Sequence, residues 1–444
     1  MTHVLVVGGT GAMGRHVVQR LLATTDATVT VPTRHPESAH AAALAATAPD
    51  RVRLVRSGPA TLETLIGQAD RVFANTDFFA TGSAVGEYRQ GLHLLSAAER
   101  AGVERFVWSS LDSPVSLTGR PVPHFDSKAA VAAHIGLMRS EEMLREETGG
   151  WYTDHVSVLT TAPYFENLRD RLTPRPDDRG GLTFKLPLGS ARYPLVALDD
   201  IAWFTCHMFD NWQSWGARDL AVIGDSLTGN EIAAAFTEVT GTPSAYIPMP
   251  HDELRAAVPD FGHDYAAMFQ FFADRDLYAR DRDIGLLRRL HPGLMTFEDW
   301  LHHTGWTGQP PTTPSPNAST HDPARRFGTR ADAGLRSGRP PSMNGHRDRA
   351  DGRGSDRPRR LRRRVGRPVR TGNSGVGGGS PAQRRCPLGA EETHLTGVRV
   401  KWVKRVSDQV LSPHGRRFRG AAPPTPPACA NPVVVVPPRV ICAR

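Results

Sequence analysis

Short apolar runs alternate with amphipathic stretches over residues 1–160. The runs are rich in β-branched residues and are bounded by Gly, Asp or Pro, which is typical of strands. Six strands are therefore expected, at residues 3–7, 27–31, 52–55, 71–75, 105–110 and 155–159. Helical patterns lie between them, for example at residues 13–24 and 85–102. Strand and helix repeated in this order predict a Rossmann-type, doubly wound α/β fold, a parallel sheet with helices on both faces.

Apolar spacing also predicts the buried face of the helix expected at residues 85–102. Leu92, Leu95, Ala98 and Ala101 follow one another at intervals of three, so we expect them on one face. Gly102 is expected to end this helix, because glycine readily adopts the left-handed conformation found just beyond a helix.

The pattern is less regular from residue 161 to residue 306. Short strands are expected at residues 193–198 and 219–224, and helices at 229–241, 265–276 and 296–303. We interpret residues 161–306 as a smaller α/β region that binds substrate or partner and packs against a Rossmann domain of residues 1–160. Phe269, Phe271 and Phe272 lie in an amphipathic pattern, which favours core packing over binding.

The composition changes near residue 308. Residues 310–444 are rich in Arg, Pro and Gly without periodicity, which predicts a disordered tail. This segment holds 27 of the 54 basic and 8 of the 45 acidic residues, so it carries about +19 and residues 1–309 carry about −10. A nucleic-acid-binding tail and an appendage without function, such as a shifted reading frame, both fit this composition. We favour the second.

The number of cysteines and the hydropathy of the chain bear on disulfide bonds, metal sites and membrane spans. Only Cys206 precedes residue 310, which argues against a disulfide framework or a CxxC metal site and fits a reducing cytoplasm. No apolar run approaches about 18 residues, so neither a transmembrane helix nor a signal peptide is expected. His302 and His303 are adjacent and cannot share a helix face as metal ligands, so no metal site is expected.

A glycine-rich turn follows the first expected strand. Gly9, Gly11 and Gly14 fit G-x-G-x-x-G, and Gly8, Gly11 and Gly14 fit the related G-x-x-G-x-x-G spacing. Such a turn brings the backbone close to a pyrophosphate, and the following helix offers free N–H groups and the positive end of its dipole. The turn therefore predicts a dinucleotide site; the alternative is a tight strand–helix turn without a ligand.

The end of the second expected strand bears on the choice of cofactor. NAD-binding Rossmann domains carry an acidic residue there, about 20 residues beyond the glycine turn, to bind the ribose 2′-hydroxyl. Arg34 occupies this place, and no carboxylate does. Because a guanidinium pairs with a 2′-phosphate, we predict NADP(H) over NAD(H). The alternative is a solvated surface arginine.

The segment PHFDSK, residues 123–128, bears on whether the protein catalyses a reduction or only binds the cofactor. Many nucleotide-dependent reductases use a tyrosine and a lysine four positions apart; here Lys128 is present and His124 replaces the tyrosine. Histidine can donate a proton. A nearby ammonium disfavours the charged imidazole, however, and a neutral imidazole is a poorer acid. The favoured alternative for His124 is a capping or hydrogen-bonding role at the start of a helix.

Several motifs together resemble a known family. They are the glycine turn, PTRHP (32–36), HFDSKAAV (124–131), PYFENL (163–168) and the long segment at 268–301. In these motifs the chain resembles the NmrA-like family, atypical members of the short-chain dehydrogenase superfamily that include NADP(H)-binding regulators. The resemblance covers about residues 3–306.

The resemblance implies a cofactor site spread along the chain. The pyrophosphate would lie on Gly8, Gly9, Thr10, Gly11, Ala12, Met13 and Gly14, with the 2′-phosphate on Arg34. Asn75, Thr76 and Asp77 would follow the cofactor, and Lys128 would reach the nicotinamide ribose. Tyr164, Phe165, Glu166 and Asn167 would lie near the nicotinamide, although core packing is an equal alternative for this stretch.

Three hypotheses follow. The first is an NADP(H)-binding, redox-sensing or regulatory protein with little or no catalysis, in which the cofactor orders loops around Asn75 and Tyr164 and changes a partner-binding surface. The family's regulators carry histidine at the place of His124, which favours this one. The second is an NADPH-dependent reductase of a quinone or small carbonyl compound, with Lys128 and His124 as catalytic residues. The third is a nucleic-acid-associated factor that acts through the tail.

Overall fold

A computed structural model describes residues 1–145, 149–216 and 218–310. The tail expected at 310–444 lies outside the described residues, except for Pro310. Within the described part, no helix is long and apolar enough to cross a membrane.

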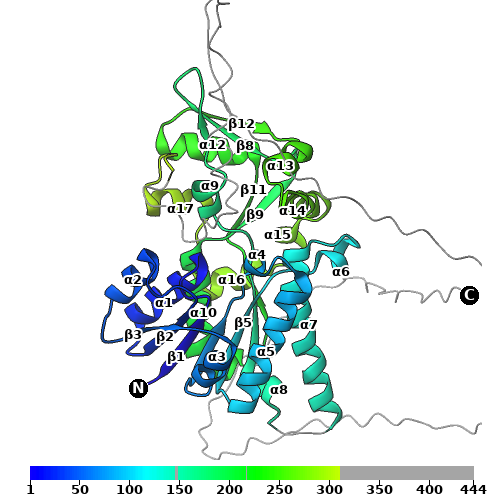
Figure 1. Cartoon of the computed structure of the whole chain (residues 1–444). Helices are drawn as coiled ribbons and strands as arrows, with labels where there is room; N and C mark the ends of the chain where they lie inside the picture. The colour runs from blue at the N-terminus through cyan, green and yellow to red at the C-terminus, as the bar shows by residue number, and fades with distance from the viewer. Residues whose placement is uncertain (146–148, 217, 311–444) are drawn as a thin grey trace, which may run out of the picture. The chain divides into compact units, whose positions relative to one another are not determined.

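The main sheet has seven parallel strands in the order β10-β6-β5-β4-β1-β2-β3 (Figure 1). They are β1 (His3–Val7), β2 (Thr28–Thr33), β3 (Val52–Arg56), β4 (Arg71–Ala74), β5 (Arg105–Ser110), β6 (Val156–Thr160) and β10 (Leu220–Ala221). All six strands expected at residues 1–160 are present, and the doubly wound fold is confirmed. The edge strand β10 comes from beyond residue 160, so residues 1–160 do not form this sheet alone.

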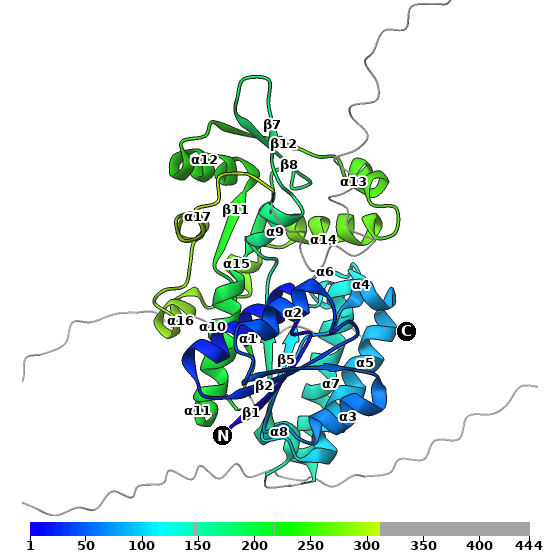
Figure 2. The same ribbon diagram turned by 60° about the vertical axis from the view of Figure 1, so that its left-hand side comes forward.

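Helices cover both faces of the main sheet (Figures 1 and 2). Val4 and Val6 of β1 point to a core shared with α1 and α10, whereas Leu5 and Val7 point to a core shared with α5 and α7. This alternation explains why β1 is apolar at successive positions. The helices are α1 (Ala12–Thr24), α2 (Ala39–Ala46), α3 (Pro59–Ile66), α4 (Phe78–Thr81), α5 (Ala84–Ala101), α6 (Pro114–Thr118), α7 (Pro123–Leu144), α8 (Trp151–His155), α10 (Leu198–Asp210) and α11 (Trp212–Trp215).

The buried face of α5 differs from the expected one. Ala101 is exposed and Leu92 is only partly buried. The buried residues are Glu87, Gly91, Leu94, Leu95, Ala97 and Ala98. Steps of three drift around a helix that has about 3.6 residues per turn, so only the middle of the predicted face was right. The helix ends at Gly102, with φ +65°, as predicted.

The smaller region has its own core and two small sheets. Strand β9 (Arg192–Leu195) pairs with β11 (Asp225–Thr228), and β8 (Leu182–Leu186) lies between β7 (Arg175–Pro176) and β12 (Ser244–Pro248). Its helices are α9 (Glu166–Asp170), α12 (Gly229–Thr240), α13 (His251–Ala257), α14 (Gly262–Asp274), α15 (Leu277–Arg280) and α17 (Phe297–Thr304). Helix α16 (Ile284–Leu290) packs instead, through Leu287, into the core that holds α1 and α10. Phe269, Phe271 and Phe272 are buried in the core of the smaller region, as predicted.

Candidate functional site

The candidate site lies at the carboxyl edge of the main sheet. Strand β1 pairs with β2 on one side and with β4 on the other, so the chain winds in opposite directions from this point. Ligands of doubly wound proteins bind where the strand order reverses in this way. The segments after β1, β2 and β4 carry the glycine turn, Arg34 and Asn75, so the topology brings these predicted residues to one edge.

The glycine turn is tightly packed. Gly8 has φ +79°, and a Cβ there would collide with the backbone oxygen of Asn75. A Cβ at Gly14 would collide with the backbone of Gly8 and Gly9. The Gly11 amide donates to the Gly8 carbonyl at 2.9 Å, which closes the turn. The turn thus needs glycine for its own geometry, whether or not a ligand is bound.

The first turn of α1 is open to an anion. Gly11 is its N-cap and offers no side-chain acceptor, and no acidic residue lies in the first turn. The leading N–H groups of a helix have no partner within the helix, so a phosphate there would find donors and a favourable dipole. Met13 is buried and accepts a hydrogen bond from Ser109 Oγ at 3.2 Å, so its side chain faces the core.

Arg34 follows β2 and is exposed. Its side chain has no polar partner among the described residues. Arg56, at the end of β3, donates to the Arg34 carbonyl at 2.8 Å and pairs with Glu37 at 2.6 Å. Two guanidinium groups therefore lie close to the place expected for a 2′-phosphate. The sequence analysis missed Arg56, which becomes a neighbour of Arg34 only through the pairing of β2 with β3.

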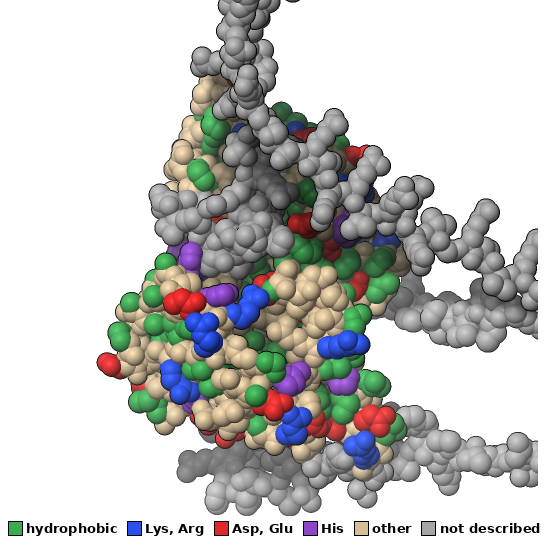
Figure 3. Space-filling view, in the orientation of Figure 1, with side chains coloured by type: hydrophobic (Ala, Val, Ile, Leu, Met, Phe, Trp, Pro, Cys, Tyr) green, Lys and Arg blue, Asp and Glu red, His purple; other side chains and the backbone are tan. Residues whose placement is uncertain are grey.

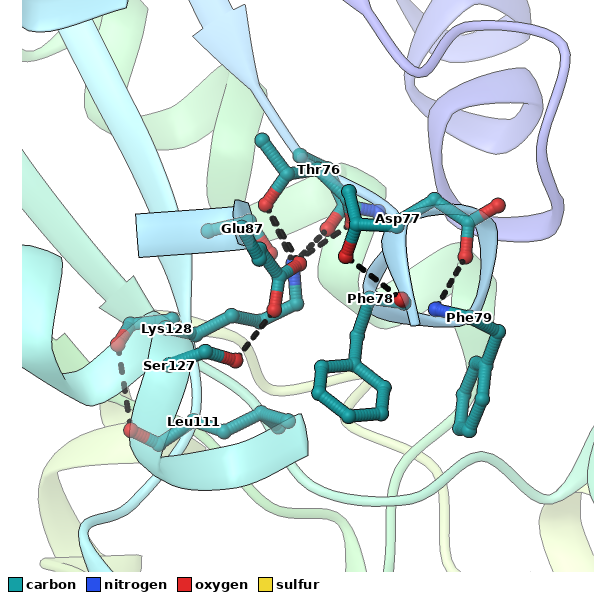
Figure 4. A network of polar contacts seen from close by, with 12 residues as sticks. Thr76, Asp77, Phe78, Phe79, Glu87, Leu111, Ser127 and Lys128 are labelled. Atoms are coloured by element: carbon teal, nitrogen blue, oxygen red, sulfur yellow. Dashed lines mark hydrogen bonds and ion pairs between the residues drawn. The ribbon is translucent and has the colours of Figure 1, made fainter. Parts of the chain in front are cut away.

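Lys128 lies on α7 with its ammonium bound to protein groups (Figure 4). Nζ donates to Thr76 O at 2.7 Å, Asn75 Oδ1 at 3.0 Å and Thr76 Oγ1 at 3.1 Å. It also pairs with Glu87 Oε1 at 3.1 Å, and the Glu87 side chain is fully buried. The structure therefore brings the predicted residues Lys128, Asn75 and Thr76 together, and adds Glu87 from α5.

Asp77 has a local role. Its Oδ1 accepts hydrogen bonds from Phe79 N at 3.1 Å and Ala80 N at 3.3 Å, so it caps α4. Figure 4 shows the Phe78 and Phe79 rings on this short helix beside the Lys128 network. Asp77 thus fixes the start of α4, and its predicted contact with the cofactor stays a prediction.

His124 is buried at the start of α7, with 8% of its surface exposed. Its Nδ1 pairs with Asp264 Oδ2 of α14, and its backbone N donates to Asp264 Oδ1 at 3.2 Å. Aromatic rings surround the imidazole, among them Phe79 at 5.5 Å and Tyr265 at 6.0 Å between centroids. The sequence analysis missed Asp264, 140 positions away. The neighbour that sets the charge environment of His124 is this carboxylate, since Lys128 contacts Asn75, Thr76 and Glu87.

The PYFENL segment is built into the smaller region. Phe165 has no exposed surface and packs against Phe297 and Trp300. Glu166 accepts from Trp300 Nε1 at 3.0 Å and Leu198 N at 3.3 Å, and burial raises the pKa of its carboxyl.

The two residues that flank Phe165 and Glu166 are less buried. Tyr164 is partly buried, and burial raises its pKa to about 12. Asn167 is also partly buried and hydrogen-bonds Tyr193. Of the four residues predicted here, Tyr164 and Asn167 keep surface that a ligand can reach.

A comparison with protein families identifies the chain. The model of the NmrA-like family matches residues 1–301. The chain belongs to the NmrA-like family. The NmrA-like family domain-containing oxidoreductase lnbB of Aspergillus flavus is 25% identical over 291 residues, covering 60% of this chain and 82% of that protein. An NmrA-like family domain-containing protein of Dictyostelium discoideum is 25% identical over 307 residues, covering 67% of this chain and 96% of that protein.

Solved structures agree in fold. The negative transcriptional regulator NmrA in complex with NAD has a TM-score of 0.52 at 17% identity, covering 67% of this chain and 94% of that one. Triphenylmethane reductase of Citrobacter sp., complexed with NADP(H), has a TM-score of 0.51 at 17% identity, covering 68% and 99%. At these identities the likeness concerns the fold alone.

The charged side chains of the described residues bear on nucleic-acid and metal binding. Figure 3 shows basic and acidic side chains interspersed on the visible face of the main-sheet region. On this face the charges do not gather into a basic stripe of the kind that nucleic-acid-binding proteins carry. Among residues 1–145, 149–216 and 218–310, no group of three or more His, Cys, Asp or Glu could hold a metal ion.

Proposed function

We propose that this NmrA-like protein binds NADP(H) along the carboxyl edge of the main sheet and acts as a redox-sensing or regulatory binding protein. The uncapped first turn of α1 fits the pyrophosphate, and exposed Arg34 fits a 2′-phosphate. Relatives in fold, NmrA and triphenylmethane reductase, are described as complexes with NAD and NADP(H). A bound reduced cofactor would supply a hydride. Whether a substrate can accept this hydride depends on the proton-transfer residues of this chain.

The state of the proton-transfer residues carries this proposal. His124 replaces the tyrosine expected of a reductase, its Nδ1 is paired with Asp264, and its side chain is only 10% exposed. The Lys128 ammonium is bound to Asn75, Thr76 and Glu87. A donor must come within hydrogen-bond reach of the new alkoxide, and an imidazole that is only 10% exposed meets this condition poorly. This arrangement supports binding over turnover.

The first test follows the fluorescence of NADPH bound to the full chain over time, with and without a panel of quinones and aldehydes. We expect enhanced fluorescence that stays constant with every acceptor. Loss of signal that depends on an acceptor would contradict the binding-only proposal and make the protein a reductase.

The His124–Asp264 pair favours a second candidate, an NADPH-dependent reductase of a flat quinone or small carbonyl compound. Hydride delivered to a carbonyl carbon leaves a negative oxygen, and His124 Nε2 would donate the proton that completes the alcohol. Asp264 would orient the ring and stabilise the imidazolium before that transfer. In this case Asp264→Asn should lower kcat at least about tenfold, whereas Asp274→Asn, elsewhere on α14, should not. Equal rates for both variants would remove the candidate.

A further inference from the structure

Glu87 is a buried acid that the proposed function has not used. It lies in the first turn of α5 and has no exposed surface. Carboxylates are almost never fully buried unless they are paired and hydrogen-bonded. Glu87 meets this condition with three partners from two segments of the chain: Thr76 in the loop after β4, and the neighbouring residues Ser127 and Lys128 of α7.

The contacts divide between the two carboxylate oxygens (Figure 4). Oε1 accepts from Thr76 Oγ1 at 2.7 Å and pairs with Lys128 Nζ at 3.1 Å. Oε2 accepts from Ser127 Oγ. Glu87 therefore ties together the residues on either side of the predicted cofactor path, the loop at 75–76 and the lysine of α7.

The acceptors around Lys128 are not equivalent. Thr76 and Glu87 are 6% and 0% exposed, whereas Asn75 is only partly buried. An ammonium has three donors. Four acceptors surround these donors: Thr76 O, Thr76 Oγ1 and Glu87 Oε1 belong to buried residues, and Asn75 Oδ1, at 3.0 Å, belongs to a partly exposed one. The donor on Asn75 is the one that a ribose hydroxyl of a bound cofactor can take over.

We propose that Glu87 is a positioning residue of the cofactor site: its buried carboxylate holds the Lys128 ammonium in place and aims one of its N–H groups at the cofactor. This inference rests on the proposed function, because it assumes that Lys128 contacts NADP(H). Lysine has a flexible four-carbon stem, so an ammonium without this anchor would lose entropy on meeting the ribose. Glu87 acts on the cofactor only through Lys128.

The test is a double-variant cycle on NADPH affinity, measured with the full chain by fluorescence titration. The variants are Glu87→Gln, Lys128→Met and both together. We expect Glu87→Gln and Lys128→Met each to weaken binding about tenfold, and the double variant to bind no more weakly than Lys128→Met alone. The matched control is Glu253→Gln, which breaks the exposed Lys185–Glu253 pair and should leave affinity unchanged.

The outcomes separate the inference from the proposed function. If the unaltered chain does not bind NADPH, the proposed function and the role of Glu87 are both wrong. If it binds and only Lys128→Met weakens binding, the proposed function stands and the role of Glu87 is wrong. An equal loss from Glu87→Gln in both backgrounds would also overturn the inference, because a general structural role does not depend on Lys128.

A milder variant covers the case in which Glu87→Gln does not fold. Ser127→Ala removes one hydrogen bond to Glu87 and leaves the charges in place. We expect it to weaken NADPH binding about threefold in the unaltered chain and not at all in the Lys128→Met background. The same loss in both backgrounds, or none in either, would contradict the proposal.

Discussion

Some charged residues of the candidate site could be predicted from the sequence, and others were found only in the structure. Arg34 and Lys128 could be predicted, because their places are defined by short distances from a strand end or within one helix. Glu87 was hidden in an apolar stripe. The spacing of Glu87, Gly91, Leu94 and Ala98 does indicate one helix face, so an acid on an apolar face is the signal that would have found it.

Arg34 provides the most direct residue-level prediction on cofactor choice. Arg34→Ala should weaken NADPH binding at least about tenfold and NADH binding by less than about twofold, because only NADPH has a 2′-phosphate to pair with the guanidinium. Titration of the full chain with each cofactor measures this. Arg89→Ala, an exposed arginine on α5, is the control. Equal losses for the two cofactors would remove Arg34 from the site.

Glu166 predicts a pH dependence of stability. Burial is the largest cause of its raised pKa in the folded protein, above the ordinary value of 4.5. A carboxyl whose pKa is raised by folding stabilises the protein fully below pH 4.5, and this contribution is lost as the pH rises through the folded pKa. Glu166→Gln stays neutral and avoids that loss. Urea unfolding at pH 4.5 and 7.5 should therefore show the variant gaining stability relative to the unaltered chain at the higher pH. A constant difference would contradict this.

At the scale of elements, hydrophobic periodicity was sufficient to predict the six strands at residues 1–160 and the helices expected at 13–24 and 85–102. It was less reliable beyond residue 160. The strand expected at 193–198 ends at Leu195, because Leu198 begins α10, and the strand expected at 219–224 is only Leu220–Ala221. Short apolar runs carry too little periodicity to distinguish a strand from the start of a buried helix.

The junction of β1 and α1 predicts the effect of a single methyl group. Gly14→Ala should destabilise the protein by about 2 kcal/mol or more, since its Cβ would collide with the backbone of Gly8 and Gly9. It should also abolish NADPH binding. Gly136→Ala on α7, where a Cβ meets open space, should stabilise by about 0.5–1 kcal/mol. Denaturant unfolding of both variants measures the contrast, and similar effects would contradict the close packing of the turn.

At the scale of the whole described part, two buried ion pairs join segments near the carboxyl edge of the main sheet to later segments of the chain. Arg282 binds Asp112 with both terminal nitrogens, at 3.0 and 2.9 Å, and Asp264 holds His124. Partners so far apart in sequence cannot be inferred from local patterns, which explains why Asp264 was not predicted as the partner of His124. A cofactor bound near α7 would lie close to contacts of the smaller region, as a regulatory role requires.

The proposed function requires NADPH to bind along the carboxyl edge of the main sheet. The most direct test is hydrogen exchange of the full chain with and without saturating NADPH, read peptide by peptide. We predict slower exchange at residues 8–14, 75–77 and 124–128, with α12 of the smaller region unchanged as an internal reference. Binding without protection of the glycine turn and the 75–77 loop, or protection confined to other segments, would contradict the proposed site.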